Sequence, residues 1–276
     1  MRGHQAAVVL AAITVASCAA PSRRLTTRIV EDPITLPRRM ASGSINVTAI
    51  HHEPTDAQEV RILPGLRFGI TDRLEWADLL GLRYAFLDDR PTDGRAPMPL
   101  SLALRGGLFG IGYSSAEGMI VVPAVSLDAL KHVSNRWALS LSVDWTAQWV
   151  SRPFAGTPAY NDALVYSSRR FSFVTLSGAV ARQLSDRVAL GIGPSLDQAT
   201  DCVSPFCDWK SRSARVSVFV GVRPLWWFTV LIAPAVGVRW RPAIALPATP
   251  PDGTPITVEP LSVTWVSLTA RLAFYW

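Results

Sequence analysis

Hydrophobic and polar residues alternate along most of this chain, and the alternation is clearest at the C-terminus. One set of alternate positions there is mostly apolar and consists of Thr264, Val266, Leu268, Ala270, Leu272, Phe274 and Trp276. The positions between them include Ser267, Thr269 and Arg271. Because successive side chains of a β-strand point to opposite faces, this period of two predicts a strand with one apolar and one polar face.

The same pattern recurs in the segments 136–150, 211–223 and 227–241. Arg215 of the segment 211–223, Arg239 of 227–241 and Arg271 of the C-terminal strand each lie on the face opposite the apolar residues. An arginine on the lipid face of a membrane barrel costs about 2–4 kcal/mol at the middle of the bilayer, but little in the lumen. The apolar faces are therefore expected to meet lipid and the arginine faces to line a lumen.

The pattern predicts an all-β chain that forms an antiparallel up-and-down transmembrane β-barrel of twelve strands. The expected strands are 41–50, 60–70, 74–87, 98–105, 108–113, 118–130, 136–150, 165–182, 187–198, 211–223, 227–241 and 262–276. A bacterial single-chain barrel has an even number of strands, so 98–113 is divided at Arg105-Gly106-Gly107. Ten strands are the alternative, if 41–50 and one other segment lie outside the wall.

The segments between the expected strands are of two kinds. Short connections rich in Asp, Asn, Ser and Pro fall at 70–73, 133–136, 184–187 and 223–226. Long connections rich in Pro, Gly and Asp fall at 88–97, 151–164, 199–210 and 243–260. Outer-membrane barrels have short periplasmic turns and long outer loops, and we expect the two kinds to divide in this way.

Composition agrees with a membrane protein but not with membrane helices. The chain has 276 residues, of which 49% are hydrophobic and 17% charged, against about 25% charged in soluble domains. Past the N-terminus, no stretch reaches the roughly 18 unbroken apolar residues of a spanning helix. A soluble antiparallel sandwich or barrel would also alternate and is the alternative. The 27 basic and 21 acidic residues form no run typical of nucleic-acid binding.

The last strand ends at the aromatic Trp276. This ending resembles the C-terminal signature of bacterial outer-membrane β-barrels. The resemblance implies a place in the outer membrane with the N-terminus in the periplasm. It also implies contact with outer-membrane lipids and with the barrel-assembly machinery.

The first twenty residues read as an export signal, with Arg2 before an apolar stretch too short for an anchor. Val15-Ala16-Ser17-Cys18 resembles the bacterial lipobox, which implies that residues 1–17 are removed and that Cys18 is lipidated. Ala19 at the next position implies sorting to the outer membrane. Ordinary cleavage after Ala19 or Ala20 is the alternative. Residues 18–40 are then a lipidated, flexible tether, and 41–276 form the barrel.

Two further cysteines, Cys202 and Cys207, lie within an expected loop and are separated by four residues. In an exported protein such a close pair is typical of a disulfide, and it lacks the additional Cys or His neighbours of a metal site.

Nine charged residues are expected to line the lumen: Arg67, Glu75, Arg83, Arg105, Asp128, Asp144, Arg215, Arg239 and Arg271. They can pair with one another and fill the lumen. Alternatively, they can line a narrow water-filled pore that prefers small anionic solutes, because arginine outnumbers the acids.

The segment His132-Val133-Ser134-Asn135 resembles the His-x-Ser-Asn element of outer-membrane phospholipase A and lipid A deacylases. That resemblance implies His132 as general base and Ser134 as nucleophile. However, Arg136 stands where those families have Gly, and the strand phase directs His132 and Ser134 toward the lumen, beside a periplasmic turn. We favour a turn at this position.

No metal or cofactor site is expected. His51-His52-Glu53 would point to alternating sides of an extended chain, and Gly106-Gly107 lacks the residues of a phosphate loop. The sequence thus favours a non-enzymatic outer-membrane barrel, either a small pore or a structural or interaction protein. The alternative is a lipid hydrolase that uses His132 and Ser134.

Overall fold

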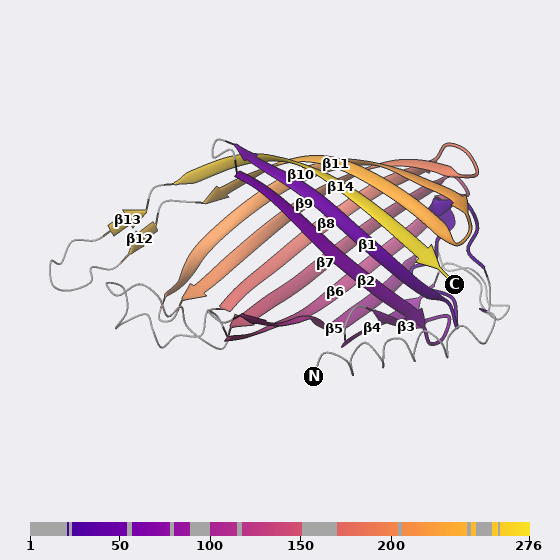
Figure 1. Ribbon diagram of the computed structural model, residues 1–276, viewed down its shortest axis with the longest axis horizontal. Coiled ribbons are helices and arrows are strands. Elements are labelled where there is room, and N and C mark those ends of the chain that lie inside the picture. The colour runs from indigo at the N-terminus through magenta and orange to yellow at the C-terminus, as the bar shows by residue number, and fades with distance from the viewer. Residues whose placement is uncertain are drawn as a thin grey trace.

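The computed structural model shows a closed antiparallel β-barrel (Figure 1). It describes residues 21, 24–53, 57–77, 80–88, 100–114, 118–150, 170–203, 206–241, 244–246, 256–258 and 260–276. A separate two-stranded sheet is formed by β12 (Ile244–Leu246) and β13 (Ile256–Val258). The one helical element in these ranges is the 3-10 turn η1 (Ile29–Glu31), and none of their helices is long and apolar enough to cross a membrane.

Twelve described strands make up the barrel wall, and all neighbouring pairs run antiparallel. They are β1 (Ala41–Glu53), β2 (Ala57–Gly69), β3 (Leu74–Ala77), β4 (Leu80–Leu87), β5 (Ser101–Ser114), β6 (Gly118–Ser134), β7 (Trp137–Val150), β8 (Arg170–Gln183), β9 (Val188–Val203), β10 (Phe206–Leu225), β11 (Phe228–Arg241) and β14 (Leu261–Tyr275). Each wall strand pairs with the next along the chain, and β1 closes the barrel by pairing with β14 from Ser42↔Tyr275 to Glu53↔Thr264. The predicted up-and-down topology and strand number are confirmed.

Two segments contain a different number of strands from the prediction, and the two differences cancel in the total of twelve. The segment 74–87 is not one strand but a hairpin of β3 and β4, whereas 98–113 is part of the single strand β5. The expected turn at Gly106-Gly107 does not form, because Gly106 pairs with Leu82 on one side and Val125 on the other. Gly107 lies directly against the backbone of Gly81, where a Cβ would collide, so Gly81 and Gly107 permit close approach of β4 and β5.

The connections are also distributed differently from the prediction. One end of the barrel, which we call the turn end, carries the short connections at 70–73, 135–136, 184–187 and 226–227, together with the C-terminus. Strand β4 ends and β5 begins at this same end, so the 88–97 connection does not belong with the outer loops. Most of the expected loop 199–210 is strand, because β9 runs to Val203 and β10 starts at Phe206. The turn end corresponds to the periplasmic end of bacterial barrels.

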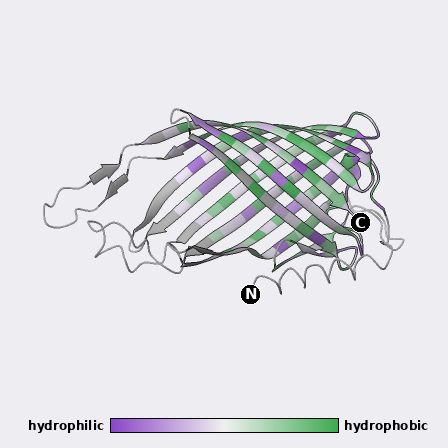
Figure 2. Cartoon of the chain, viewed as in Figure 1, coloured by the Kyte–Doolittle hydropathy of each residue, from purple (hydrophilic) through white to green (hydrophobic). Residues whose placement is uncertain are grey.

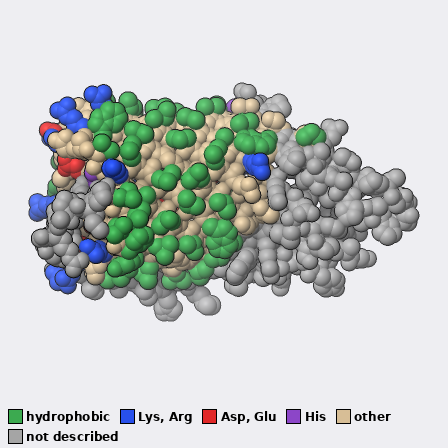
Figure 3. Space-filling view, turned by 180° about the vertical axis from the view of Figure 1, so that it is seen from behind, with side chains coloured by type: hydrophobic (Ala, Val, Ile, Leu, Met, Phe, Trp, Pro, Cys, Tyr) green, Lys and Arg blue, Asp and Glu red, His purple; other side chains and the backbone are tan. Residues whose placement is uncertain are grey.

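The predicted strand phase agrees with the exposure of the side chains. On β10, Val216, Val218 and Val220 are each more than 40% exposed, whereas Ser213 and Arg223 on the opposite face are buried. The same division holds on β7 and β14. Hydrophobic and hydrophilic residues alternate along the wall strands (Figure 2). On the face seen in Figure 3, apolar side chains cover the middle of the outer wall, and basic side chains gather near the turn end. The exterior is therefore that of a membrane-spanning barrel, and the protein is an outer-membrane β-barrel.

Candidate functional site

The N-terminal residues 24–40, here called the plug segment, lie within the turn end of the barrel. The sequence predicts a flexible, solvated linker for this stretch. Instead, Leu25, Val30, Ile34, Leu36 and Met40 are all buried. Their burial removes apolar surface from water, which provides the main driving force for holding the segment in place.

Alanines on the inner wall make room for these side chains. Val30 packs against Ala138 of β7 and Ala189 of β9, while Ile34 packs against Ala85 of β4 and Ala103 of β5. All four alanines are 7% exposed or less. In the sequence, the small residues on the lumen face near the turns indicate that another segment of the chain packs inside this end of the barrel.

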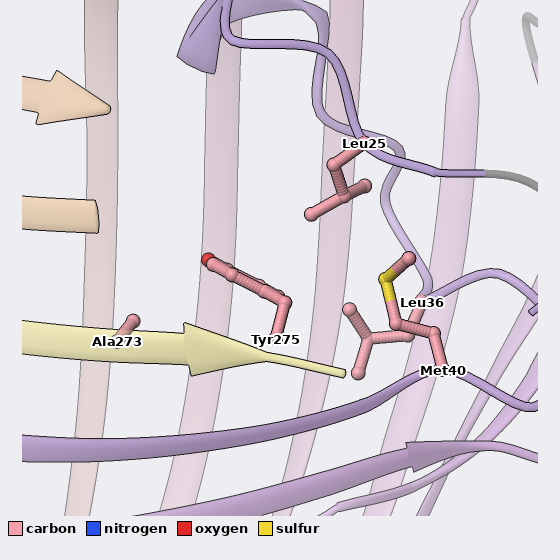
Figure 4. Close-up of a cluster of buried hydrophobic side chains, with 5 residues drawn as sticks. All are labelled: Leu25, Leu36, Met40, Ala273 and Tyr275. Carbon is pink, nitrogen blue, oxygen red and sulfur yellow. The ribbon is translucent and has the colours of Figure 1, made fainter. Parts of the chain in front are cut away.

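A third cluster joins both ends of the plug segment to the last strand (Figure 4). Leu25, Leu36 and Met40 pack with Ala273 and Tyr275 of β14, and Trp226 lies against the cluster. The segment is thus held on several sides of the lumen.

Arg223 of β10 anchors the plug segment through polar contacts. Its two terminal nitrogens donate hydrogen bonds of 2.6 Å to the two carboxylate oxygens of Asp32. It also donates to the carbonyl of Thr26 at 3.0 Å and to the hydroxyl of Thr229 at 2.7 Å. Arg223 is fully buried, so Asp32 provides the opposite charge that a buried guanidinium requires. Arg223 is not among the nine expected lumen residues because the sequence places it in the short connection 223–226.

Further hydrogen bonds fasten the plug segment to the wall. Glu75 of β3 accepts a hydrogen bond of 2.7 Å from the backbone of Leu36. Gln183 accepts one of 3.1 Å from the backbone of Val30, and the Thr35 hydroxyl donates to the carbonyl of Asp72. At the rim, Arg28 donates two bonds to one carboxylate oxygen of Asp186, and this contact raises the pKa of Arg28 above its ordinary value.

The structure brings six of the nine expected lumen residues into a connected network of ion pairs and hydrogen bonds. Arg67 binds Glu75 through two hydrogen bonds of 2.9 and 2.7 Å, and Glu75 is completely buried. Arg83 donates to Asp128 at 2.7 Å and lies 3.8 Å from Glu75. Arg105 donates to Asp144 at 3.0 Å. The hydroxyl of Ser142 lies 2.8 Å from both Asp128 and Asp144 and connects the two pairs.

The other three expected lumen residues are arginines that lie outside this network. Arg215 donates to the hydroxyl of Ser195 at 3.1 Å. Arg239 lies on β11, opposite Ser213 of β10, and is exposed. Arg271 lies on β14, opposite Asn46 of β1, and lines a cavity in the lumen.

This cavity has a volume of about 480 Å³ and lies directly against the plug segment. The plug contributes Ile29, Val30, Asp32, Pro33 and Ile34 to its lining. The wall contributes, among others, Arg67, Arg83, Asp128, Phe219 and Arg271. The volume is within the range of about 300–1,000 Å³ that is typical of small-molecule sites.

The segment that resembles lipolytic enzymes lies at the turn end. His132 of β6 pairs with Ala138, whose side chain is buried on the lumen side, and the Ser134 hydroxyl accepts a hydrogen bond from the backbone N–H of Arg136. Asn135 and Arg136 form the turn itself. This is the turn that the sequence favours, and we assign no catalytic step to His132 and Ser134.

Neither the lipidation of Cys18 nor the disulfide between Cys202 and Cys207 is tested by the described residues. Cys18 lies outside the described residues, and the side chains of Cys202 and Cys207 are likewise not described. Lipidation and the disulfide remain predictions. Among the described side chains, no group of three or more His, Cys, Asp and Glu could hold a metal ion.

Comparisons with known proteins give a likeness of fold alone. No protein-family model and no curated protein matches the chain. OmpT, an outer membrane protein of Vibrio cholerae, shares 11% identity at a TM-score of 0.39, over 86% of this chain and 96% of that one. An anion-selective porin from Comamonas acidovorans shares 10% identity at 0.40, over 85% and 98%. Ail, the attachment invasion locus protein of Yersinia pestis, shares 10% at 0.29, over 86% and 98%. At these values the likenesses carry no inference about what this chain binds or transports.

Proposed function

We propose that this protein is a small outer-membrane pore whose lumen is closed at the periplasmic end by its own plug segment. The observation that carries the proposal is the contact between Arg223 and Asp32, which ties the segment to the wall from within the lumen. Passage of a solute requires this contact to open and the segment to move.

The plug segment suits a movable closure because it is not part of the sheet. Its contacts with the wall are side-chain packing, the paired hydrogen bonds of Arg223 and Arg28, and scattered hydrogen bonds such as those made by Glu75 and Gln183. Moving it would leave the strand pairing of β1 through β14 unchanged. A barrel of this strand number can then be closed or open without refolding.

The charges of the lumen favour anions in the open state. Among the described residues, Arg215, Arg239 and Arg271 make no ion pair, whereas Glu75, Asp128 and Asp144 are each paired with an arginine. Asp197, also on the lumen side, accepts a hydrogen bond from the Ser213 hydroxyl, so three arginines stand against one acid outside the ion pairs. The lumen therefore carries an excess of positive charge, and rings of basic residues favour anion passage.

Single-channel recording in planar bilayers tests the proposal with the full-length protein. We expect wild type to be closed for most of the recording, and Arg223→Gln to conduct steadily because the plug segment loses its charged anchor. Arg215→Gln is the matched control for closure, since it removes a lumen arginine without touching the plug, and should stay closed as wild type does. A salt gradient should give a reversal potential of the sign expected for anions.

Each of the other outcomes contradicts the proposal. Steady large currents in wild type would show that the plug segment does not close the pore. The absence of current in both wild type and Arg223→Gln would favour a structural or interaction protein of the outer membrane.

A further inference from the structure

The cavity beside the plug segment is lined by more positively charged than negatively charged side chains. Arg67, Arg83 and Arg271 line it together with two acids, Asp32 and Asp128. Asp32 is already bound by Arg223, and Asp128 by Arg83. Arg67 shares two hydrogen bonds with Glu75. Within the described part of the chain, Arg271 is thus the cavity arginine that makes no ion pair.

Two of these arginines also keep a buried N–H group without an acceptor. The Nε atoms of Arg83 and Arg271 are both inaccessible to solvent, and neither has a hydrogen-bond partner among the described residues. Buried donors of charged groups are costly to leave unpaired, so an acceptor in the cavity toward which these two guanidinium groups can turn would stabilise them.

The arginines act on one another as well. Arg67 repels both Arg83 and Arg271 electrostatically. Like charges held close together in a partly desolvated lumen are stabilised by an anion between them. A planar guanidinium prefers a carboxylate or phosphate, whose paired oxygens match its donors.

The remainder of the lining limits the size and character of the anion. Hydroxyl groups of Ser140, Ser142 and Ser177 line the wall, and Ile29 and Pro33 of the plug segment supply apolar surface. A compact oxyanion with a short apolar part would match both surfaces within about 480 Å³.

We propose that this cavity is a binding site for a small oxyanion, a carboxylate or a phosphate, held by Arg271 together with Arg83 above the plug segment. The inference rests on the proposed function only in that the plug segment forms part of the site. Binding at equilibrium needs no conduction, so the two proposals can fail separately.

Isothermal titration of the full-length protein in detergent tests the site. The probes are acetate, succinate and inorganic phosphate, each titrated against a chloride background of equal ionic strength. We expect saturable binding of at least one probe with a stoichiometry near one, weakened about tenfold or more in Arg271→Gln, as for the loss of one charged hydrogen bond. Arg239→Gln, which removes a lumen arginine outside the cavity, is expected to bind as wild type does.

Arg271→Lys covers the case in which Arg271→Gln does not fold, because it keeps the charge but not the planar pair of donors. We expect it to fold and to bind more weakly than wild type. The choice among probes identifies the class: preference for phosphate or for a carboxylate assigns the ligand accordingly. No saturable binding of any probe, or equal binding by wild type and both Arg271 variants, would overturn the proposal.

Discussion

Arg223 and Asp32 lie 191 residues apart in the chain, yet two hydrogen bonds of 2.6 Å join them inside the barrel. One belongs to a wall strand and the other to the plug segment. Since Arg223 is fully buried, removing its partner would leave a buried charge without compensation. The free energy that holds the plug segment in place should therefore depend strongly on this pair.

We predict that Asp32→Asn weakens the closed state of the plug segment by about 3 kcal/mol, the lower end for breaking a buried ion pair. Hydrogen exchange of the backbone amides at 28–36 should accelerate accordingly. Asp186→Asn is the control, because its ion pair with Arg28 lies at the exposed rim, where solvent screens it, and should contribute little. Equal acceleration in both variants would contradict the role of Asp32.

A second prediction concerns Glu75, which is completely buried and binds both Arg67 and the backbone of Leu36. Glu75→Gln removes the negative charge between two arginines and should lower the free energy of unfolding by about 3–5 kcal/mol. Urea unfolding in lipid vesicles, followed by tryptophan fluorescence, measures this change. Asp144→Asn, at a partly exposed pair with Arg105, should cost clearly less. Similar losses in the two variants would show that burial of Glu75 is not decisive.

A third prediction uses the close contact between β10 and the plug segment. A Cβ at Gly221 would lie 2.7 Å from Cδ1 of Ile29, so a large side chain there must displace the segment. We predict that Gly221→Leu destabilises the closed state by about 1–3 kcal/mol, as overpacking does, and raises channel opening in bilayers. At Gly106 the nearest atoms to an added Cβ are 4.0 Å away, so Gly106→Leu should leave conductance unchanged. Unchanged conductance in Gly221→Leu would contradict the prediction.

The features that the sequence predicts well are local ones. Each strand carries its own period of two, so the facing of Val218 and Arg271 follows from their neighbours without knowledge of the fold. The β3–β4 hairpin instead places Gly81 against the backbone of Gly107 on β5, a contact between separate strands that no local sequence pattern predicts.

The plug segment was missed for a similar reason. Val30 and Ile34 lie in a stretch interrupted by Pro33 and Pro37, and their burial depends on alanines from four distant strands. The sequence predicts a flexible tether for residues 18–40, whereas the structure places Arg28 at the rim and buries the apolar side chains of residues 24–40 in the lumen. The site therefore arises from contacts between segments that the sequence describes only separately.

A fourth prediction compares the cost of an arginine on the lipid face and on the lumen face of β10. Val218, near the middle of β10, is 42% exposed on the lipid side, while the neighbouring Ser217 faces the lumen and donates to the carbonyl of Gly193. We predict that Val218→Arg costs about 2–4 kcal/mol in vesicles and that Ser217→Arg costs clearly less. Folding yield and urea midpoint in vesicles measure both. An equal cost at the two positions would contradict the assignment of the faces.

The last prediction concerns Cys18, for which lipidation is expected from the sequence. Five residues separate Cys18 from Arg24, whose guanidinium lies 5.2 Å from the ring centre of Trp226 at the turn end. Fully extended, this stretch spans about 20 Å, which is enough for acyl chains on Cys18 to enter the membrane beside the barrel while the plug segment stays in place. We predict that mass spectrometry of the protein from outer membranes will find an N-terminal peptide that begins at acylated Cys18. An unmodified peptide beginning at Ala20 or Pro21 would show ordinary cleavage instead, and the plug segment would then be held by its lumen contacts alone.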